Sequence, residues 1–188
     1  MTNKIIIGIL GEMGSGKSTI AQYITKTYQA SHYRFSDFLR EILEKLYIPP
    51  TRANLIDLFL VLAPRFGEDV LAKPMKELID KDNNTFVVVE GIRRAADISL
   101  LKELPNFYLV GITSPEDIRY ARITARREKS DDSTKTYEGF KKDEQRPTET
   151  LIADMIKTVD YQVINNGTLE QLYTEINNIV REVKTKQN

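Results

Sequence analysis

The sequence predicts an α/β fold in three layers, with a five-stranded parallel sheet covered by helices on both faces. Short β-branched and aromatic runs alternate along the chain with segments of helical apolar spacing, which is the order of βαβ units. The runs at 86–90 and 107–112 are almost continuously apolar, as strands buried on both faces of a sheet tend to be. In addition, the first run leads straight into a glycine-rich turn and a helix-forming segment.

Five segments carry the strand signal. We expect strands at 4–10, 32–36, 85–90, 107–113 and 161–164. The third and fourth of these are the most apolar, so they belong at the centre of the sheet.

Two helices have clear start signals. Residues 114–117 combine an N-cap serine, a first-turn proline and two acids, which suit the positive end of a helix. Residues 168–171 form a capping box, and apolar residues follow it at helical spacing. This last helix is expected to pack one apolar stripe against the sheet.

Two segments interrupt the simple alternation. Residues 37–80 are long enough for two or three helices, and the stretch at 51–63 is apolar on most of its circumference, which predicts burial on several sides or a role in covering a pocket. Residues 126–150 are highly charged. That segment is either a surface helical hairpin or a flap that carries arginines onto a phosphate chain.

Composition bounds the class of protein. A chain of 188 residues suits a single domain, 1–188, with a core at 1–36, 81–127 and 151–188, a helical insertion at 37–80 and a flap at 128–150. Its 27 basic and 27 acidic residues balance, which makes nucleic-acid binding an unfavoured main activity. The absence of cysteine fits a reducing compartment. With no apolar run of membrane length and no signal-peptide pattern, the expectation is a cytoplasmic protein, with monomer and homodimer both open.

The most informative motif is Gly-x-x-x-x-Gly-Lys-Ser at 11–18. Its glycines allow successive main-chain N–H groups to turn inward around a phosphate, and the following helix directs its positive end at the same anion. Lys17 would reach the outer phosphates and the Ser18 hydroxyl would bind Mg²⁺. The residues expected to bind the nucleotide here are Gly11, Glu12, Met13, Gly14, Ser15, Gly16, Lys17, Ser18 and Thr19.

Four motifs in order give the chain a resemblance that covers nearly its whole length. They are the phosphate-binding loop, 35–40 (Phe-Ser-Asp-Phe-Leu-Arg), 88–93 (Val-Val-Glu-Gly-Ile-Arg) and 164–167 (Ile-Asn-Asn-Gly). In this order the chain resembles the P-loop nucleoside monophosphate kinases, and within them the adenylate-kinase-related and dephospho-coenzyme-A-kinase-like group. The resemblance implies ATP as donor, Mg²⁺ as cofactor, and small nucleotides as substrates.

For the acceptor side, the resemblance singles out Asp37 and Arg40. It implies that Arg40 binds the phosphate of the acceptor and that Asp37 orients or deprotonates the attacking oxygen. Both residues also have structural alternatives: Asp37 could be a helix cap, in competition with Ser36, and Arg40 could pair with Glu44 one helical turn on.

Glu90 and Arg93 follow the third strand, at the sheet edge where ligands of open α/β folds gather. A buried acid there needs a partner, and the water shell of Mg²⁺ would supply one. The resemblance implies Asp at this position, so the longer Glu90 could instead pair with Arg93. Arg93 matches an arginine that contacts the acceptor phosphate in the family and would act in catalysis, with Arg94 as the alternative.

The charged segment supplies the expected donor-side arginines. Related kinases place arginines that grip the donor phosphates here, and Arg126 is favoured, with Arg122 and Arg146 in support. Arg127 lies about 100° around the helix from Arg126. Lys129 stands where the family has a second arginine. A solvated surface is the alternative role for each of these residues.

The loop after the fifth strand contains Asn165, Asn166 and Gly167, which resemble a loop that packs beside the base of the donor nucleotide. Locally, a turn closing the strand explains the same residues. His32 is the only histidine, and without cysteine it cannot build a transition-metal site, so it is expected to be structural.

Together these features favour transfer of the γ-phosphoryl group of Mg·ATP to a small acceptor that already carries a phosphate. A nucleoside or deoxynucleoside monophosphate is favoured over dephospho-coenzyme A, whose ribose hydroxyl would need Asp37 as a base. A P-loop ATPase that switches a partner protein, with no small acceptor, is the alternative from another class.

Overall fold

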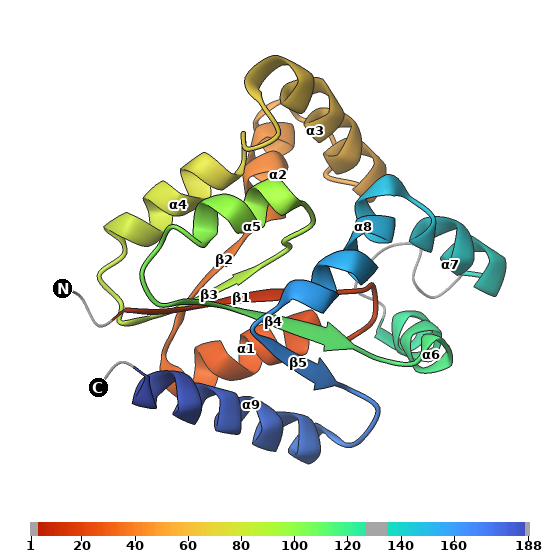
Figure 1. Cartoon of the computed structure of the whole chain (residues 1–188). Coiled ribbons are helices and arrows are strands. Elements are labelled where there is room, and N and C mark those ends of the chain that lie inside the picture. The colour runs from red at the N-terminus through yellow and green to blue at the C-terminus, as the bar shows by residue number, and fades with distance from the viewer. Residues whose placement is uncertain (1–3, 127–134, 187–188) are drawn as a thin grey trace.

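The computed structural model describes residues 4–126 and 135–186, and these form one parallel sheet with helices on both faces (Figure 1). The five strands are β1 (Ile5–Gly11), β2 (Ser31–Arg34), β3 (Phe86–Glu90), β4 (Phe107–Thr113) and β5 (Tyr161–Ile164). Their order in the sheet is β2-β3-β1-β4-β5. The expected α/β fold and parallel sheet are confirmed, with β3, β1 and β4 in the interior positions, so the third and fourth strands lie inside the sheet as predicted.

The second strand is shorter than expected. β2 ends at Arg34, which lies opposite Glu90, and Ser36 belongs to the helix that follows. The reason is that β3 ends at Glu90 and the chain turns at Gly91, with φ of 81°, so Phe35 and Ser36 have no strand partner. As the first two residues of α2, they direct their carbonyl groups into helical hydrogen bonds instead.

Helices connect the strands and cover the sheet. They are α1 (Lys17–Tyr28), α2 (Phe35–Lys45), α3 (Arg52–Phe66), α4 (Ala72–Lys81), α5 (Ala95–Leu101), α6 (Glu116–Arg126), α7 (Tyr137–Glu144), α8 (Pro147–Met155), the 3₁₀ turn η2 (Ile156–Thr158) and α9 (Leu169–Thr185). Among the residues that the structure describes, no helix has both the length and the apolar character needed to cross a membrane.

The alternation of side chains along β1 divides the core in two. Ile5, Ile7 and Ile9 pack with α1 and α9 on one face, whereas Ile6 and Leu10 pack on the other face with α2, α4, α5 and α8 (Figure 1). Because successive side chains of a strand point to opposite faces, a strand this apolar requires cover on both sides.

The segment expected to hold two or three helices contains α2, α3 and α4. The expectation that the apolar stretch of α3 would be buried on several sides is wrong: Phe59 and Ala63 are buried, but Leu60, Val61 and Phe66 are 58%, 70% and 62% exposed. Figure 1 shows the cause, since α3 stands at the margin of the molecule and only one of its sides meets the core.

The capping box of α9 forms as expected. Thr168 Oγ1 accepts a hydrogen bond from the Gln171 N–H, and the Gln171 side chain accepts one from the Thr168 N–H. The apolar stripe Leu172, Ile176, Ile179, Val180 and Val183 is buried against the sheet. Local sequence and tertiary packing therefore agree on where this helix begins.

Thr168→Ala is expected to lower the free energy of unfolding by about 1 kcal/mol, because the first turn of α9 loses a hydrogen-bond acceptor. The measurement is urea denaturation followed by circular dichroism. Thr174→Ala, at an exposed position inside the same helix, is the matched control and should change stability little. An equal loss in both variants would contradict the importance of the cap.

Candidate active site

The site is built on the loop between β1 and α1. Gly14 and Gly16 have φ values of 78° and 107°, a region that other residues adopt only at a cost. α1 begins at Lys17 directly after Gly16, and no described side chain caps its first turn. The Ser15 N–H donates to the Glu12 carbonyl oxygen at 3.2 Å. The N–H groups of the first helical turn are available to an anion, as the motif predicted.

Neighbouring segments pack so closely on the loop that two of its glycines are required sterically. A Cβ atom at Gly14 would lie 2.6 Å from the carbonyl oxygen of Arg119 in α6. A Cβ atom at Gly16 would overlap the Asn165 amide nitrogen in the loop after β5. The phosphate-binding loop is therefore held in shape by contacts from distant parts of the chain.

Lys17 lies against the loop itself. Its Nζ atom donates to the carbonyl oxygens of Gly11 and Glu12, with both N···O distances at 2.7 Å. These bonds hold the ammonium group next to the glycine-rich backbone, which is where a polyphosphate bound by the loop would meet it.

Asn165 connects the loop to the far edge of the sheet. It is 6% exposed, and its amide nitrogen donates to the carbonyl oxygen of Ser15 at 2.8 Å. Its backbone and side-chain oxygens accept hydrogen bonds from Arg122, and its backbone oxygen accepts another from Ser114. Asn165 thus positions the loop, whereas Asn166 and Gly167 are exposed.

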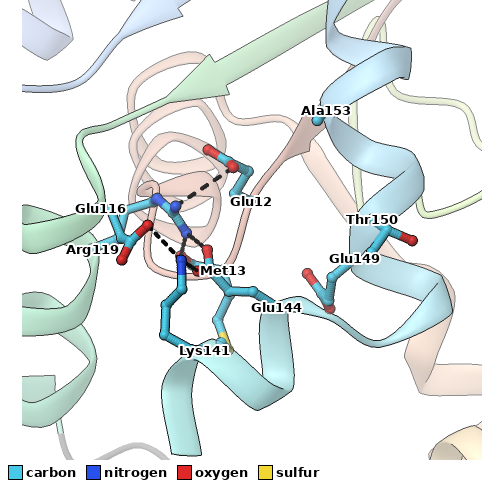
Figure 2. A pocket seen from close by; sticks show the side chains of 9 residues that line it. All are labelled: Glu12, Met13, Glu116, Arg119, Lys141, Glu144, Glu149, Thr150 and Ala153. Carbon is cyan, nitrogen blue, oxygen red and sulfur yellow. Dashed lines mark hydrogen bonds and ion pairs between the residues drawn. The ribbon is translucent and has the colours of Figure 1, made fainter. Parts of the chain in front are cut away.

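Arg119 was not identified from the sequence, yet it is the most buried arginine near the loop, at 5% exposed. It donates to the carbonyl oxygen of Ser114 at 3.0 Å. It also donates to the carbonyl oxygen of Met13 at 3.3 Å and pairs with Glu144, and Figure 2 shows these last two residues beside it. Arg119 lies one helical turn before Arg122, and this spacing could have indicated from the sequence that both face the same side of the helix. Arg119 ties α6 to the loop.

A cavity of about 270 Å³ opens beside the loop, between α6, α7 and α8 (Figure 2). Its lining residues are Glu12, Met13, Glu116, Arg119, Lys141, Glu144, Glu149, Thr150 and Ala153. Lys141 pairs with both Glu116 and Glu144, so much of the acidic charge in the wall is already neutralised. The cavity gives a small molecule access to the phosphate-binding loop.

Glu90 ends β3, as the sequence indicated, and is 3% exposed. It pairs with Arg34 rather than Arg93, and His32 Nε2 lies 3.3 Å from the same oxygen, Oε1. Burial opposes its ionisation, but the bonds from His32 and Arg34 outweigh burial and lower the pKa of Glu90 to about 2. The carboxyl group is therefore charged at neutral pH.

Ser18 and Glu90, the residues expected to bind Mg²⁺, carry oxygen atoms that suit this ion. Within the described residues, the contacts of Glu90 all go to Oε1, which leaves Oε2 for a metal-bound water. A hydroxyl and a carboxylate are the hard oxygen donors that Mg²⁺ prefers. Across residues 4–126 and 135–186 there is no acidic or histidine cluster able to hold a metal alone, so nucleotide phosphates would have to complete the coordination.

Two arginines meet at one buried carboxylate beside the loop. Arg93 Nη1 and Arg52 Nη2 both contact Glu149 Oε1, the latter at 2.8 Å. Arg93 was expected in this region, but Arg52 and Glu149 were not. Arg52 also donates to Met13 Sδ of the loop at 2.9 Å. The arginines come from elements separated in sequence, so spacing alone gave no sign of the pair.

Asp37 and Arg40 both lie in α2, where their side chains are 50% and 39% exposed. The helix starts at Phe35 with Arg34 as its N-cap, so Ser36 and Asp37 lie inside the first turn, and the alternative role as a cap is wrong for both. Arg40 Nε lies 3.9 Å from Asp37 Oδ1, and Arg40 therefore pairs with Asp37 rather than Glu44.

The donor-side arginines are only partly described. Arg126 is the last residue of α6, but its side chain lies outside the described part of the structure, as do Arg127 and Lys129. Arg122 bonds to Ser114 and Asn165, and burial lowers its pKa. Arg146 pairs with Asp143 at 2.7 Å.

Arg94, the alternative to Arg93, has a structural role. It pairs with Asp97, which is fully buried, and its guanidinium group lies 3.6 Å from the ring centre of Phe59. A guanidinium group engaged on both sides in this way anchors α5 to α3.

A five-stranded parallel sheet with a glycine-rich phosphate-binding loop after its first strand defines a nucleotide-binding protein of the P-loop class with a kinase-like fold. The family model described as AAA domain (AAA_17) matches residues 10–138, more than half of the 188-residue chain. The chain belongs to this family.

The most similar relatives include UPF0200 proteins of archaea. The chain is 25% identical to one from Methanococcus maripaludis over 180 residues, and 29% identical to one from Sulfurisphaera tokodaii over 179 residues. Each alignment covers 95% of this chain and 97% of the relative.

Among solved structures, the chain is similar to shikimate kinases. The enzyme of Aquifex aeolicus aligns with a TM-score of 0.56 at 16% identity, covering 95% of this chain and 97% of that one. The shikimate kinase of Acinetobacter baumannii in complex with shikimate aligns with a TM-score of 0.53 at 16% identity, covering 96% and 95%. At these identities the likeness is one of fold.

Glu90→Gln is expected to lower the free energy of unfolding by about 2 to 3 kcal/mol at pH 7, because Arg34 loses its buried counter-charge. The folded pKa lies below the ordinary value, so the carboxylate stabilises the fold above about pH 4.5, and this contribution is lost as the pH falls toward about 2. The difference between wild type and variant should shrink over that range.

Urea denaturation between pH 3 and pH 7 measures this difference. Glu103→Gln, at an exposed position, removes the same charge and should leave stability nearly unchanged. A difference for Glu90→Gln that stays constant with pH would contradict the role given to the ion pair.

Proposed function

We propose that the protein transfers the γ-phosphoryl group of Mg·ATP to a small acceptor that carries a phosphate, with a nucleoside or deoxynucleoside monophosphate favoured. One observation carries the proposal. The phosphate-binding loop, which would bind the donor, lies next to two arginines that could bind the phosphate of an acceptor. Met13 of the loop contacts Arg52, and Arg52 and Arg93 both bind Glu149. Two guanidinium groups at this place suit a second anion, such as the phosphate of an acceptor.

Each group has a role in this reaction. The loop amides and Lys17 bind the donor phosphates, and Ser18, with Glu90 through a water, holds Mg²⁺. The metal ion, when bound, neutralises charge on the phosphoryl group in transfer. Arg93 and Arg40 bind the phosphate of the acceptor and align the attacking oxygen. Arg126, with Arg122, is proposed to stabilise the transferring group, since planar guanidinium groups suit its charge.

A hydroxyl acceptor is the second candidate, and the position of Asp37 favours it. Its side chain is half exposed in the first turn of α2 and does not cap that helix, so it is available to a substrate. A carboxylate there could take the proton of a ribose hydroxyl, as in dephospho-coenzyme A. Shikimate kinases share the fold, which adds shikimate to the acceptors to be tested.

The remaining expectations accompany this proposal. The balanced charge, with 27 basic and 27 acidic residues, favours small-molecule partners over nucleic acid. We also propose a cytoplasmic location and a monomer or homodimer. The chain is proposed to form a single domain with an acceptor-binding insertion at 37–80 and a flap at 128–150.

The test is ADP release from Mg·ATP with a panel of mononucleotides, dephospho-coenzyme A, shikimate and no acceptor. Release that depends on a mononucleotide supports the proposal. Release with dephospho-coenzyme A or shikimate alone supports the hydroxyl acceptor. Strong release without any acceptor supports an ATPase that acts on a partner protein and overturns transfer to a small acceptor.

Lys17→Ala is expected to reduce transfer by at least 100-fold, because the outer phosphates lose their neutralising cation. The measurement is kcat/KM for ATP. Lys26→Ala, in the last turn of the same helix and exposed, is the matched control. Wild-type turnover in the Lys17 variant would remove the phosphate role assigned to this lysine.

Asp37→Asn separates the two acceptor classes. With a hydroxyl acceptor the reaction loses its base, so kcat should fall by about 100-fold or more. With a phosphate acceptor, which is already ionised, kcat should fall by less than about tenfold.

Arg40→Ala should mainly raise the apparent KM of the acceptor. An effect of Arg40→Ala confined to ATP would contradict its place on the acceptor side.

A further inference from the structure

Glu149 lies between two arginines that face the phosphate-binding loop. Its Oε1 atom accepts hydrogen bonds from Arg52 in α3 and from Arg93 after β3. The side chain of Glu149 is 5% exposed, against 19% for Arg52 and 32% for Arg93. Two guanidinium groups thus converge on a single buried oxygen atom.

The pairing leaves hydrogen-bonding capacity unused. Glu149 Oε2 is buried and has no hydrogen-bond partner among the residues the structure describes. Arg52 Nη1 is 3.6 Å from its second carboxylate, Asp143, which also pairs with Lys135 and Arg146 at 2.6 and 2.7 Å. A buried carboxylate oxygen without a donor is costly, so this arrangement is a poor permanent ion pair.

A phosphate group matches the two arginines better than this carboxylate does. Guanidinium groups present planar pairs of donors that bind phosphate oxygens bidentately, and a phosphate offers three oxygens where Glu149 offers one. Burial also lowers the pKa of the Arg52 guanidinium, while the charge of Glu149 opposes this effect. The position therefore favours an anion.

Glu149 has room to leave. It lies in the first turn of α8, and Figure 2 shows its side chain pointing from that helix toward the cavity beside the loop. Rotation of the side chain into this space would free both arginines.

We propose that Arg52 and Arg93 form the binding site for the acceptor phosphate, and that Glu149 is an internal competitor which occupies this site until the acceptor displaces it. The inference rests on the proposed function, to which it adds Arg52 as a binding residue and Glu149 as a residue that sets acceptor affinity. A phosphate dianion displaces the glutamate because it gains more hydrogen bonds from the same guanidinium groups.

The test uses inorganic phosphate as the probe and the dependence of the melting temperature on phosphate concentration as the measure of Kd. Saturating Mg²⁺ and β,γ-imido-ATP fill the phosphate-binding loop. Glu149→Gln keeps the size of the side chain and removes its charge, so phosphate is expected to bind about tenfold more tightly than to wild type. Arg52→Met should weaken binding by about tenfold or more.

Asp154→Asn is the matched control, since it removes the same charge from an exposed position on α8 and should leave the phosphate Kd unchanged. Glu149→Asp keeps the net charge but shortens the competitor, so it should also tighten binding. This second variant decides the question if Glu149→Gln fails to fold. Unchanged or weaker phosphate binding in the Glu149 variants, or equal tightening in Asp154→Asn, would overturn the inference.

Failure of the proposed function is distinguishable from failure of this inference. No turnover with any acceptor, together with tighter phosphate binding in the Glu149 variants, would leave the anion site standing and remove the kinase. Turnover with an acceptor and no response of phosphate binding to Glu149 or Arg52 would leave the kinase and remove the internal competitor.

Discussion

The structure depends on one constraint, the need to hold the backbone of the loop at 11–18 in a conformation that can surround an anion. Gly14 and Gly16 supply the φ angles, but they do not fix them. Asn165 and Arg119 do so, because their hydrogen bonds to Ser15 and Met13 join the loop to the end of β5 and to α6. The shape of the anion site therefore depends on α6 and on the loop after β5 as well as on the glycine-rich loop itself.

The buried arginines around the site are paired with acidic side chains of the same chain. Buried arginines would be unfavourable without counter-charges, and acids from α7 and α8 supply them: Glu144 binds Arg119, and Glu149 binds Arg52 and Arg93. Glu144 of α7 and Glu149 in the first turn of α8, both within the expected flap at 128–150, therefore hold these arginines in place. An anion that binds Arg52 and Arg93 would compete with Glu149 for the same guanidinium groups.

Much of the fold could be predicted from sequence because its signals are local. The continuous apolar run of β1, the glycine pattern at 11–18 and the capping box at Thr168 each specify the structure of a short segment by local stereochemistry. The boundary of β2 could not be predicted, since the strand ends where its partner does, at Glu90. The exposure of Leu60 and Val61 depends equally on where α3 stands.

By itself the sequence determined the class of fold and the phosphate-binding loop, since both follow from backbone geometry that neighbouring residues impose on one another. Only the tertiary structure decided which side chains meet at the site. Arg34 rather than Arg93 pairs with Glu90, and Arg52 joins Arg93 on Glu149, across 97 residues in the case of Arg52. Such pairs arise because parallel strands deliver their carboxyl ends to one edge, where distant segments become neighbours.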